Sequence, residues 1–377
     1  MAASVKEIVE TYSPDTPLPE ASTPPSSWYV DPRIFELERS TIFARSWQVV
    51  GRADQVREPG QYITCELARE PILVIRGNDG ILRGFFNVCR HHAATVMPNA
   101  EGRTQTFRCP YHGWTYNLDG ALIVTPDFAG VRNFDRSANG LIPVQAAIWE
   151  GLLFVKLSPG GLSLEGFLGV DLTQQIRQLS LEKLRWMERR TYILNCNWKV
   201  FVDNYLDGGY HVPHIHGGLN SVLDHGKYTI ATGERFCLQS SPISTEKADE
   251  QTAAVRKGDR ALYYWIYPNL MINWYAGVMD TNLVCARGVD RTEVFFDFYF
   301  ADTSKPSRER NLASIAVSER IQAEDRAICE SVQRGLTSRA YTAGRLSVRR
   351  EAGEHLFHRL LYADLKSGLL SDGSYPQ

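Results

Sequence analysis

The sequence predicts an α+β fold, in which an all-β module precedes a larger module of antiparallel strands and long helices. Two patterns lead to this prediction. Short β-branched and aromatic runs alternate with Gly, Asn and Asp turns between about residues 47 and 157, a texture typical of a compact all-β module. Strand-like runs return between 261 and 302 and are followed by long amphipathic segments, which favours an antiparallel sheet wrapped around helices.

Three regions follow one another along the chain. Residues 1–46 form an N-terminal arm and a helix, since five of the 18 prolines lie near the start and Pro32 suits the beginning of a helix over 32–46. Residues 47–157 make up the all-β module. Residues 158–377 form the larger module, and we expect the arm to pack on it.

Three helices are expected in the larger module. Residues 191–205 read as a strand that runs into a helix. A long amphipathic helix is expected over about 307–334, because Pro306 precedes it and Gly335 suits a helix end. A last helix is expected over about 348–366.

Composition and charge exclude several classes of protein. The 377 residues contain 41 Lys and Arg against 43 Asp and Glu, a net charge of −2. This balance gives no basic field for nucleic acid or an anionic membrane, so neither partner is expected. No segment approaches about 20 apolar residues and no signal peptide is evident, so we expect a soluble cytoplasmic protein. Seven cysteines, an odd number, argue against a disulfide framework.

Two Cys/His pairs lie within the all-β module. Cys89-x-His91 is followed after 17 residues by Cys109-x2-His112. Structural zinc sites usually group their ligands as Cys-x2-4-Cys with a distant histidine pair. One thiolate and one imidazole from each loop suit instead a [2Fe–2S] cluster, in which two thiolates hold one iron and two imidazoles the other.

Three of the nine histidines, His211, His214 and His216, lie close together in the larger module. Pro213 interrupts the segment, so helix geometry does not choose which pair shares a face. Two histidines and one carboxylate form the facial triad of non-haem Fe(II) oxygenases. Carboxylates at Glu324, Asp325 and Glu330 are available downstream, and the residues alone do not distinguish among them.

Both halves of the first pattern match a known motif. Cys89-Arg90-His91 and the run from Cys109 to Trp114 are similar to the two halves of the Rieske motif, and with the histidine cluster the chain resembles the α subunits of Rieske non-haem iron oxygenases. The resemblance implies a catalytic domain of helix-grip, START-like fold after the Rieske domain. It also implies the ligands: Cys89, His91, Cys109 and His112 for the [2Fe–2S] cluster, and His211, His216 and Asp325 for a mononuclear Fe(II), with His214 left as a pocket residue.

The family pattern Asn-x6-His-x4-His fits Asn204, His211 and His216. The family usually has a carboxylate three residues before the first metal histidine, where it bridges that histidine to a Rieske ligand of the neighbouring subunit. Here that position is Gly208. The resemblance therefore makes Asp207 the expected bridge, with Asn204, Asp203 or a water molecule as alternatives.

Residues 200–216, 263–283 and 324–336 resemble choline monooxygenase and its relatives, which share this departure. A quaternary ammonium substrate needs an aromatic cage. Alternation along a strand places Tyr263, Trp265 and Tyr267 on one face, although an aromatic substrate would use the same lining. The expected pocket residues are Tyr210, His214, Tyr263, Trp265, Tyr267 and Trp274.

The resemblance implies the terminal component of an oxygenase that uses O2 to hydroxylate a C–H bond of a small, choline-like or N-methyl compound. The electron donor would be a separate NAD(P)H-dependent reductase or a ferredoxin, and the assembly a homotrimer. An aromatic ring-hydroxylating or demethylating oxygenase is the alternative within the family. From other classes, a Rieske electron-transfer or binding protein without a working mononuclear iron, and a zinc-stabilised binding protein, remain open.

Overall fold

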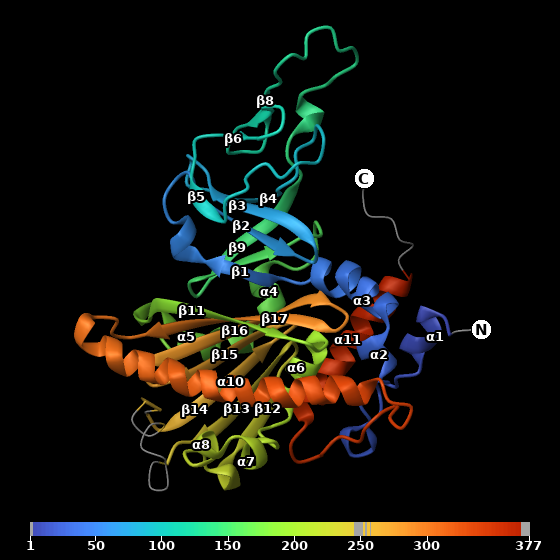
Figure 1. Cartoon of the computed structure of the whole chain (residues 1–377), viewed down its shortest axis with the longest axis vertical. Coiled ribbons are helices and arrows are strands. Elements are labelled where there is room, and N and C mark those ends of the chain that lie inside the picture. The colour runs from blue at the N-terminus through green and yellow to red at the C-terminus, as the bar shows by residue number, and fades with distance from the viewer. Residues whose placement is uncertain (1–2, 245–251, 253–254, 257, 371–377) are drawn as a thin grey trace. The chain divides into compact units, whose positions relative to one another are not determined.

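The computed structural model describes residues 3–244, 252, 255–256 and 258–370. It divides into two compact units (Figure 1). Residues Phe43–Phe167 form one, called here the β unit, and Met1–Ile42 together with Leu168–Gln377 form the other, the mixed unit. The N-terminal arm thus belongs to the same unit as the C-terminal helices.

The β unit contains two antiparallel sheets, in agreement with the all-β prediction. The larger has the strand order β1-β10-β9-β4-β3-β2-β5 and the smaller β6-β7-β8. Two clusters of buried apolar side chains form its core. The strands are β1 (Gln48–Arg52), β2 (Gln61–Leu67), β3 (Glu70–Arg76), β4 (Leu82–Phe86), β5 (Glu101–Arg103), β6 (Phe107–Arg108), β7 (Thr115–Tyr116), β8 (Leu122–Val124), β9 (Pro143–Trp149) and β10 (Leu152–Lys156), with short helices η3 (Ala53–Val56) and η4 (Ser137–Asn139).

The mixed unit is built on one antiparallel sheet, in the order β11-β17-β16-β15-β14-β13-β12. Figure 1 shows the long helix α10 lying across this sheet, as the α+β prediction requires. Within the sheet, Tyr263 pairs with Asn273 and Asn273 with Asp280, so these three side chains form a row across one face. The strands are β11 (Arg185–Leu194), β12 (Thr229–Thr232), β13 (Phe236–Pro242), β14 (Arg260–Ile266), β15 (Leu270–Tyr275), β16 (Val278–Gly288) and β17 (Arg291–Phe300).

The helices differ from the sequence-based prediction at their ends. The segment expected as a helix over 32–46 is helical from residue 32 to residue 45, but a π-helical turn over Arg39–Phe43 interrupts the α-helix. The long helix includes Gly335, because the N–H of Thr337 still bonds back into the last turn. The helices of this unit, with the connecting α4, are α1 (Val5–Glu10), η1 (Leu18–Glu20), α2 (Ser27–Val30), α3 (Pro32–Glu38), η2 (Arg39–Phe43), α4 (Leu164–Leu168), α5 (Val170–Arg177), η5 (Leu181–Lys183), α6 (Trp198–Leu206), α7 (Val212–Ile215), α8 (Gly217–Asn220), η6 (His225–Lys227), η7 (Lys305–Ser307), α10 (Arg308–Leu336) and α11 (Ala352–Leu370).

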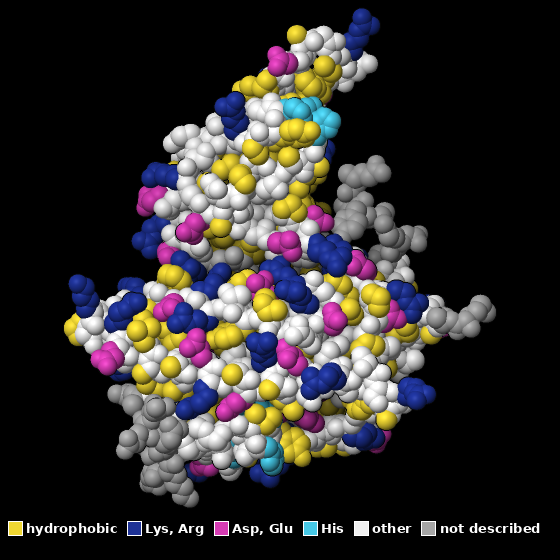
Figure 2. All heavy atoms as spheres, in the orientation of Figure 1, with side chains coloured by type: hydrophobic (Ala, Val, Ile, Leu, Met, Phe, Trp, Pro, Cys, Tyr) yellow, Lys and Arg dark blue, Asp and Glu magenta, His cyan; other side chains and the backbone are white. Residues whose placement is uncertain are grey.

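On the face of the mixed unit shown in Figure 2, basic and acidic side chains are interspersed. This distribution agrees with the near-zero net charge of the chain. Among the described residues, no helix is both long and apolar enough to cross a bilayer.

A buried ion pair joins α3 to α6. Glu38 accepts hydrogen bonds from Lys199 Nζ and, at 2.9 Å, from Trp198 Nε1. The side chains of Lys199 and Glu38 are both fully buried. Two opposite charges that are fully buried stabilise each other, because either one alone would keep its full desolvation cost.

Replacing Lys199 by Met should therefore lower the free energy of unfolding by about 3–5 kcal/mol, since it leaves the Glu38 carboxylate buried without its counter-charge. Urea denaturation followed by circular dichroism measures the change. Lys366→Met is the matched control, because that lysine pairs with Glu10 where their side chains are 32% and 37% exposed. Equal losses in the two variants would show that the buried pair has no special role.

Candidate functional site

Side-chain hydrogen bonds align α10 with the segment that contains α6. The N–H of Asn195 donates to Glu330 Oε1 at 3.0 Å, and the N–H of Asn197 donates to Gln333 Oε1 at 2.8 Å. Asn197 also caps α6, where its side chain accepts from the backbone of Lys199. These contacts fix the register of the two helices, so residues further along each of them meet in a defined way.

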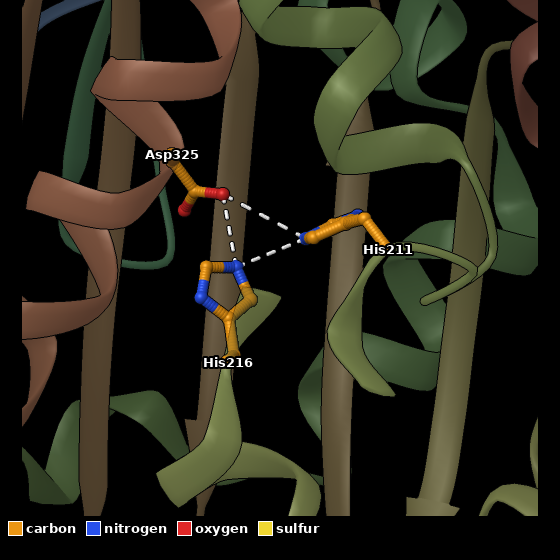
Figure 3. A group of neighbouring side chains, drawn as sticks. All are labelled: His211, His216 and Asp325. Atoms are coloured by element: carbon orange, nitrogen blue, oxygen red, sulfur yellow. Dashed lines mark hydrogen bonds and ion pairs between the residues drawn. The ribbon is translucent and has the colours of Figure 1, made fainter. Parts of the chain in front are cut away.

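Three side chains converge from the two segments (Figure 3). His211 Nε2 lies 3.0 Å from His216 Nε2, and His216 Nε2 lies 3.0 Å from Asp325 Oδ1. His211 Nε2 and Asp325 Oδ1 are 3.6 Å apart. Ligands at right angles around a metal, each bonded at about 2.1 Å, are separated by about 3.0 Å. The three atoms therefore fit one face of a metal ion, and each of them points toward the same place.

The remaining polar atom of each histidine also has a partner. His211 Nδ1 lies 2.6 Å from Asp207 Oδ2, and His216 Nδ1 lies 2.6 Å from Glu324 Oε2. A carboxylate at Nδ1 holds the proton there and leaves the Nε2 lone pair free for a metal. Asn204 Nδ2 donates to Asp325 Oδ1 at 2.9 Å, which orients the third side chain.

Glu324 and Asp325 are neighbours on α10, and the structure separates their roles. Asp325 faces both Nε2 atoms, whereas Glu324 binds His216 from the opposite ring edge. Burial lowers the pKa of His216, but the two carboxylates outweigh it and raise that pKa overall. The same negative surroundings favour a metal cation. Sequence reasoning weighed Glu324 only as a rival ligand and missed this contact, since no pattern marks it.

The turn between α6 and α7 brings Asp207, the expected bridge, to His211. Gly208 and Gly209 both have left-handed backbone, with φ of 67° and 66°. A Cβ on Gly208 would lie 2.2 Å from the backbone oxygen of Arg350, so no side chain fits there. The double turn brings Asp207 within bonding distance of His211, whose N–H also donates to Asp207 Oδ2 at 2.9 Å.

The two Cys/His loops of the β unit share one hydrogen-bond pattern. In each, the cysteine N–H donates to the carbonyl five residues later at 2.8 Å, and the N–H four residues later donates back at 3.0 or 3.1 Å. The residue four after the cysteine, Ala93 or Gly113, has φ of 58° or 73°. Cys89 and Cys109 therefore sit in two matching tight turns, an arrangement that suits the two ends of one bound group.

The donor atoms of these loops fit a [2Fe–2S] cluster. Both thiols are buried, and Cys89 Sγ lies 3.4 Å from the hydroxyl of Tyr116. The rings of His91 and His112 are 4.7 Å apart. Burial lowers the pKa of His91, and its Nδ1 is buried with no partner within the described part of the chain. Figure 2 shows histidine side chains gathered on the surface of this unit, where His92 and His112 are exposed.

A cavity extends from His211, His216 and Asp325 along the sheet face. Its aromatic wall comes from helix α6, from the sheet and from Tyr228, which lies between η6 and β12. Tyr205 and Tyr228, which sequence reasoning missed, take part in it. The aromatic side chains are Phe201, Tyr205, Tyr228, Tyr263, Tyr275 and Phe296.

Of the pocket residues expected from sequence, Tyr263 lines this cavity and the others lie elsewhere. Tyr210 and His214 are exposed. Trp265 packs against Phe357 of α11 at 5.4 Å between ring centroids. The cavity lining also excludes Tyr267, whose hydroxyl donates to Asp364, and Trp274, which alternates with the lining residues on its strand. The expectation for these five residues is corrected. Trp265 and Tyr267 share a strand face with Tyr263, but alternation does not say where along that face the cavity lies. Trp274 is on the other face of its strand, and Tyr210 and His214 lie in the exposed turn and helix beside the cavity.

Comparison with known proteins identifies families and relatives that this chain resembles. Residues 46–135 match the Rieske [2Fe-2S] domain, and residues 181–366 match the catalytic domain of the ring hydroxylating alpha subunit. The chain is 39% identical to the chloroplastic choline monooxygenase of Arabidopsis thaliana, over 97% of this chain and 88% of that protein. It is 30% identical to the carnitine monooxygenase oxygenase subunit of Escherichia coli K12, over 87% and 90%.

The chain belongs to the Rieske non-haem iron oxygenases, as an α subunit. The β unit contains the Rieske domain, which binds a [2Fe–2S] cluster, and the mixed unit contains the catalytic domain, which binds a mononuclear iron. A solved quaternary ammonium Rieske monooxygenase has a TM-score of 0.83 and 26% identity, over 97% of this chain and 99% of that one. Naphthalene 1,2-dioxygenase from Rhodococcus sp., at a TM-score of 0.74 and 21% identity over 93% and 95%, shares the fold.

His211→Ala should remove one iron per chain and leave acid-labile sulfide unchanged, because it deletes one of three convergent donors but no donor of the β unit. Metal analysis of anaerobically purified protein measures both. His214→Ala is the control, since this exposed histidine lies three residues away but outside the cluster. Iron content that stays equal in the two variants would mean that His211 is no ligand.

Proposed function

We propose that this Rieske oxygenase hydroxylates a C–H bond next to the nitrogen of a quaternary ammonium or related N-methyl compound. The observation that supports this most is the aromatic wall of the cavity, which begins at the three convergent donors. Ring faces attract an ammonium by roughly 0.5–2 kcal/mol each. Burial raises the pKa of the phenols of Tyr205, Tyr228 and Tyr263 well above its usual value, so these rings stay neutral.

In this proposal His211, His216 and Asp325 hold the mononuclear iron, and Cys89, His91, Cys109 and His112 hold the cluster. When bound, the cluster supplies single electrons and the iron activates O2. The reaction consumes O2, two electrons and two protons for each substrate; one oxygen atom enters the C–H bond and the other leaves as water. A hydroxylated N-methyl group then loses formaldehyde, which makes N-demethylation the neighbouring outcome.

The chain's own residues prepare the site for this chemistry. Asp207 and Glu324 keep the Nδ1 protons of the two histidines, and Asn204 orients Asp325. The buried rings limit the water that reaches the substrate. Asp207 has the additional role of the bridge through which an electron enters from a neighbouring subunit, because its carboxylate bonds His211 and no side chain fits at Gly208.

The partners follow from the same chemistry. A separate NAD(P)H-dependent reductase or a ferredoxin supplies the electrons, and identical subunits assemble, as a homotrimer, so that one subunit's cluster serves its neighbour. All seven cysteines lie among the described residues and no disulfide joins any two of them, which agrees with a cytoplasmic location.

Product analysis tests the proposed function directly. The reconstituted enzyme with a surrogate reductase should consume O2 and form one hydroxylated or demethylated product per O2 from at least one N-methyl compound, among choline, carnitine and other betaines. Under 18O2 that product, or the formaldehyde it releases, should contain one labelled atom. Oxygen uptake that yields only peroxide with every such compound would contradict the proposal.

The variants Asp207→Asn and Glu324→Gln distinguish a carboxylate that carries electrons between subunits from one that only holds its histidine in place. Each variant weakens one carboxylate–histidine contact of 2.6 Å, and turnover should fall by about 10- to 100-fold in both. Only Asp207→Asn should also slow the oxidation of the reduced cluster in a single turnover, followed by stopped-flow absorbance. Equal cluster oxidation rates in the two variants would remove Asp207 as the bridge.

A further inference from the structure

A buried cation lies in the cavity, and the proposed function does not use it. Arg256 lines the cavity and is 2% exposed. Its two terminal nitrogens donate to the hydroxyls of Ser314 and Ser318 on α10, at 2.9 and 2.8 Å. The guanidinium lies 4.6 Å from the ring centroid of Tyr275. Arg256 Nε is buried and has no hydrogen-bond partner among the described residues.

Neutral serines do not compensate the charge of Arg256. Across the described residues, no carboxylate forms an ion pair with it, in contrast to Lys199, which contacts Glu38. Asp280 also lines the cavity, and burial raises the pKa of this acid overall, because it outweighs the charge of Arg256, which lowers that pKa. The Asp280 carboxylate accepts hydrogen bonds from the amides of Asn273 and Asn282, and no ion pair to Arg256 is formed among the described residues. A guanidinium without a contacting anion keeps much of its desolvation cost. An anion bound in the cavity would offset that cost.

A second buried donor without a hydrogen-bond partner among the described residues lies on α10, the helix whose serines bind Arg256. Gln322 lines the cavity, is 2% exposed, and its Nε2 has no partner in the described part of the structure. Ser314, Ser318 and Gln322 follow one another at four-residue spacing, so they share one face of α10. Two buried donors without partners on one wall call for an acceptor, and a carboxylate offers two oxygens for them.

Along α10, the serines that bind Arg256 lie some distance from Asp325 and the two histidines that it faces. Ser318 precedes Asp325 by seven residues, which is about 10 Å along a helix axis. Phe201 and Tyr205 flank Asn204, the residue that contacts Asp325. The cavity thus has aromatic rings beside the reacting end and, at the Arg256 end, a cation that lies against the ring of Tyr275.

We propose that Arg256 is a specificity-determining residue that binds the carboxylate of the substrate, so that the site selects betaines, with an ammonium and a carboxylate, over choline-like cations. This inference rests on the proposed function and refines it. Choline has a hydroxyl in place of the carboxylate, and a hydroxyl provides no charge for Arg256. A zwitterion satisfies both ends of the cavity at once.

Binding to the holoenzyme under anaerobic conditions tests the inference without turnover. The probes are trimethylammonio carboxylates with one to four methylene groups, each paired with its methyl ester, and choline. Isothermal titration should show at least one carboxylate binding about 10- to 100-fold more tightly than its ester, the range expected for hydrogen bonds to a charged group. Arg256→Met should abolish this preference, and Arg256→Lys should restore part of it.

Arg308→Met is the matched control, because this exposed arginine of α10 lies outside the cavity lining, and it should keep the preference. If Arg256→Met fails to fold, the wild-type comparison of acid with ester and the Lys variant decide. Esters and choline that bind as tightly as the acids would overturn the inference, and product formation from choline would then leave the proposed function intact. No product from any N-methyl compound would instead contradict the proposed function.

Discussion

The hydrogen bonds between α10 and the segment 195–216 are the interaction on which the catalytic site depends. Four side chains of α10 bind this segment: Glu324, Asp325, Glu330 and Gln333. Two of these contacts lie at the beginning of α6 and fix the helix register, and the other two lie at the three convergent side chains, which could hold a metal ion. Because the donors come from segments more than 100 residues apart, only this packing brings them within 3.0–3.6 Å.

The mixed unit contains two buried cations, and they differ in whether a carboxylate pairs with them. Lys199 has its counter-ion in place, so the pair contributes to holding α3 against α6. Arg256 is also buried, but among the described residues its terminal nitrogens bind two serine hydroxyls and its guanidinium lies against the ring of Tyr275, with no carboxylate in an ion pair. Burying a charge without a contacting counter-ion costs free energy. Arg256 lies on a cavity wall, where a bound anion would offset that cost.

The turn at Gly208 shows how a departure from a family pattern is accommodated. The carbonyl of Arg350 occupies the space that a side chain at this position would need. A carboxylate lies one residue earlier, at Asp207, and two consecutive left-handed glycines let it contact His211. Both changes are required together, because a carboxylate at Asp207 on a continuous helix would not meet both the N–H and the ring of the histidine that follows.

Sequence alone determined the local features of this protein. The Cys/His spacings lie within tight turns whose backbone bonds span five residues or fewer, and the strand and helix periodicities predicted the α+β class. Tertiary structure decided the rest. It gave Glu324 and Asp325 different roles, placed Tyr263 in the cavity but Trp265 against α11, and brought Arg256 to the same cavity. These outcomes depend on which faces pack together across long stretches of chain, and residue spacing contains no information about that.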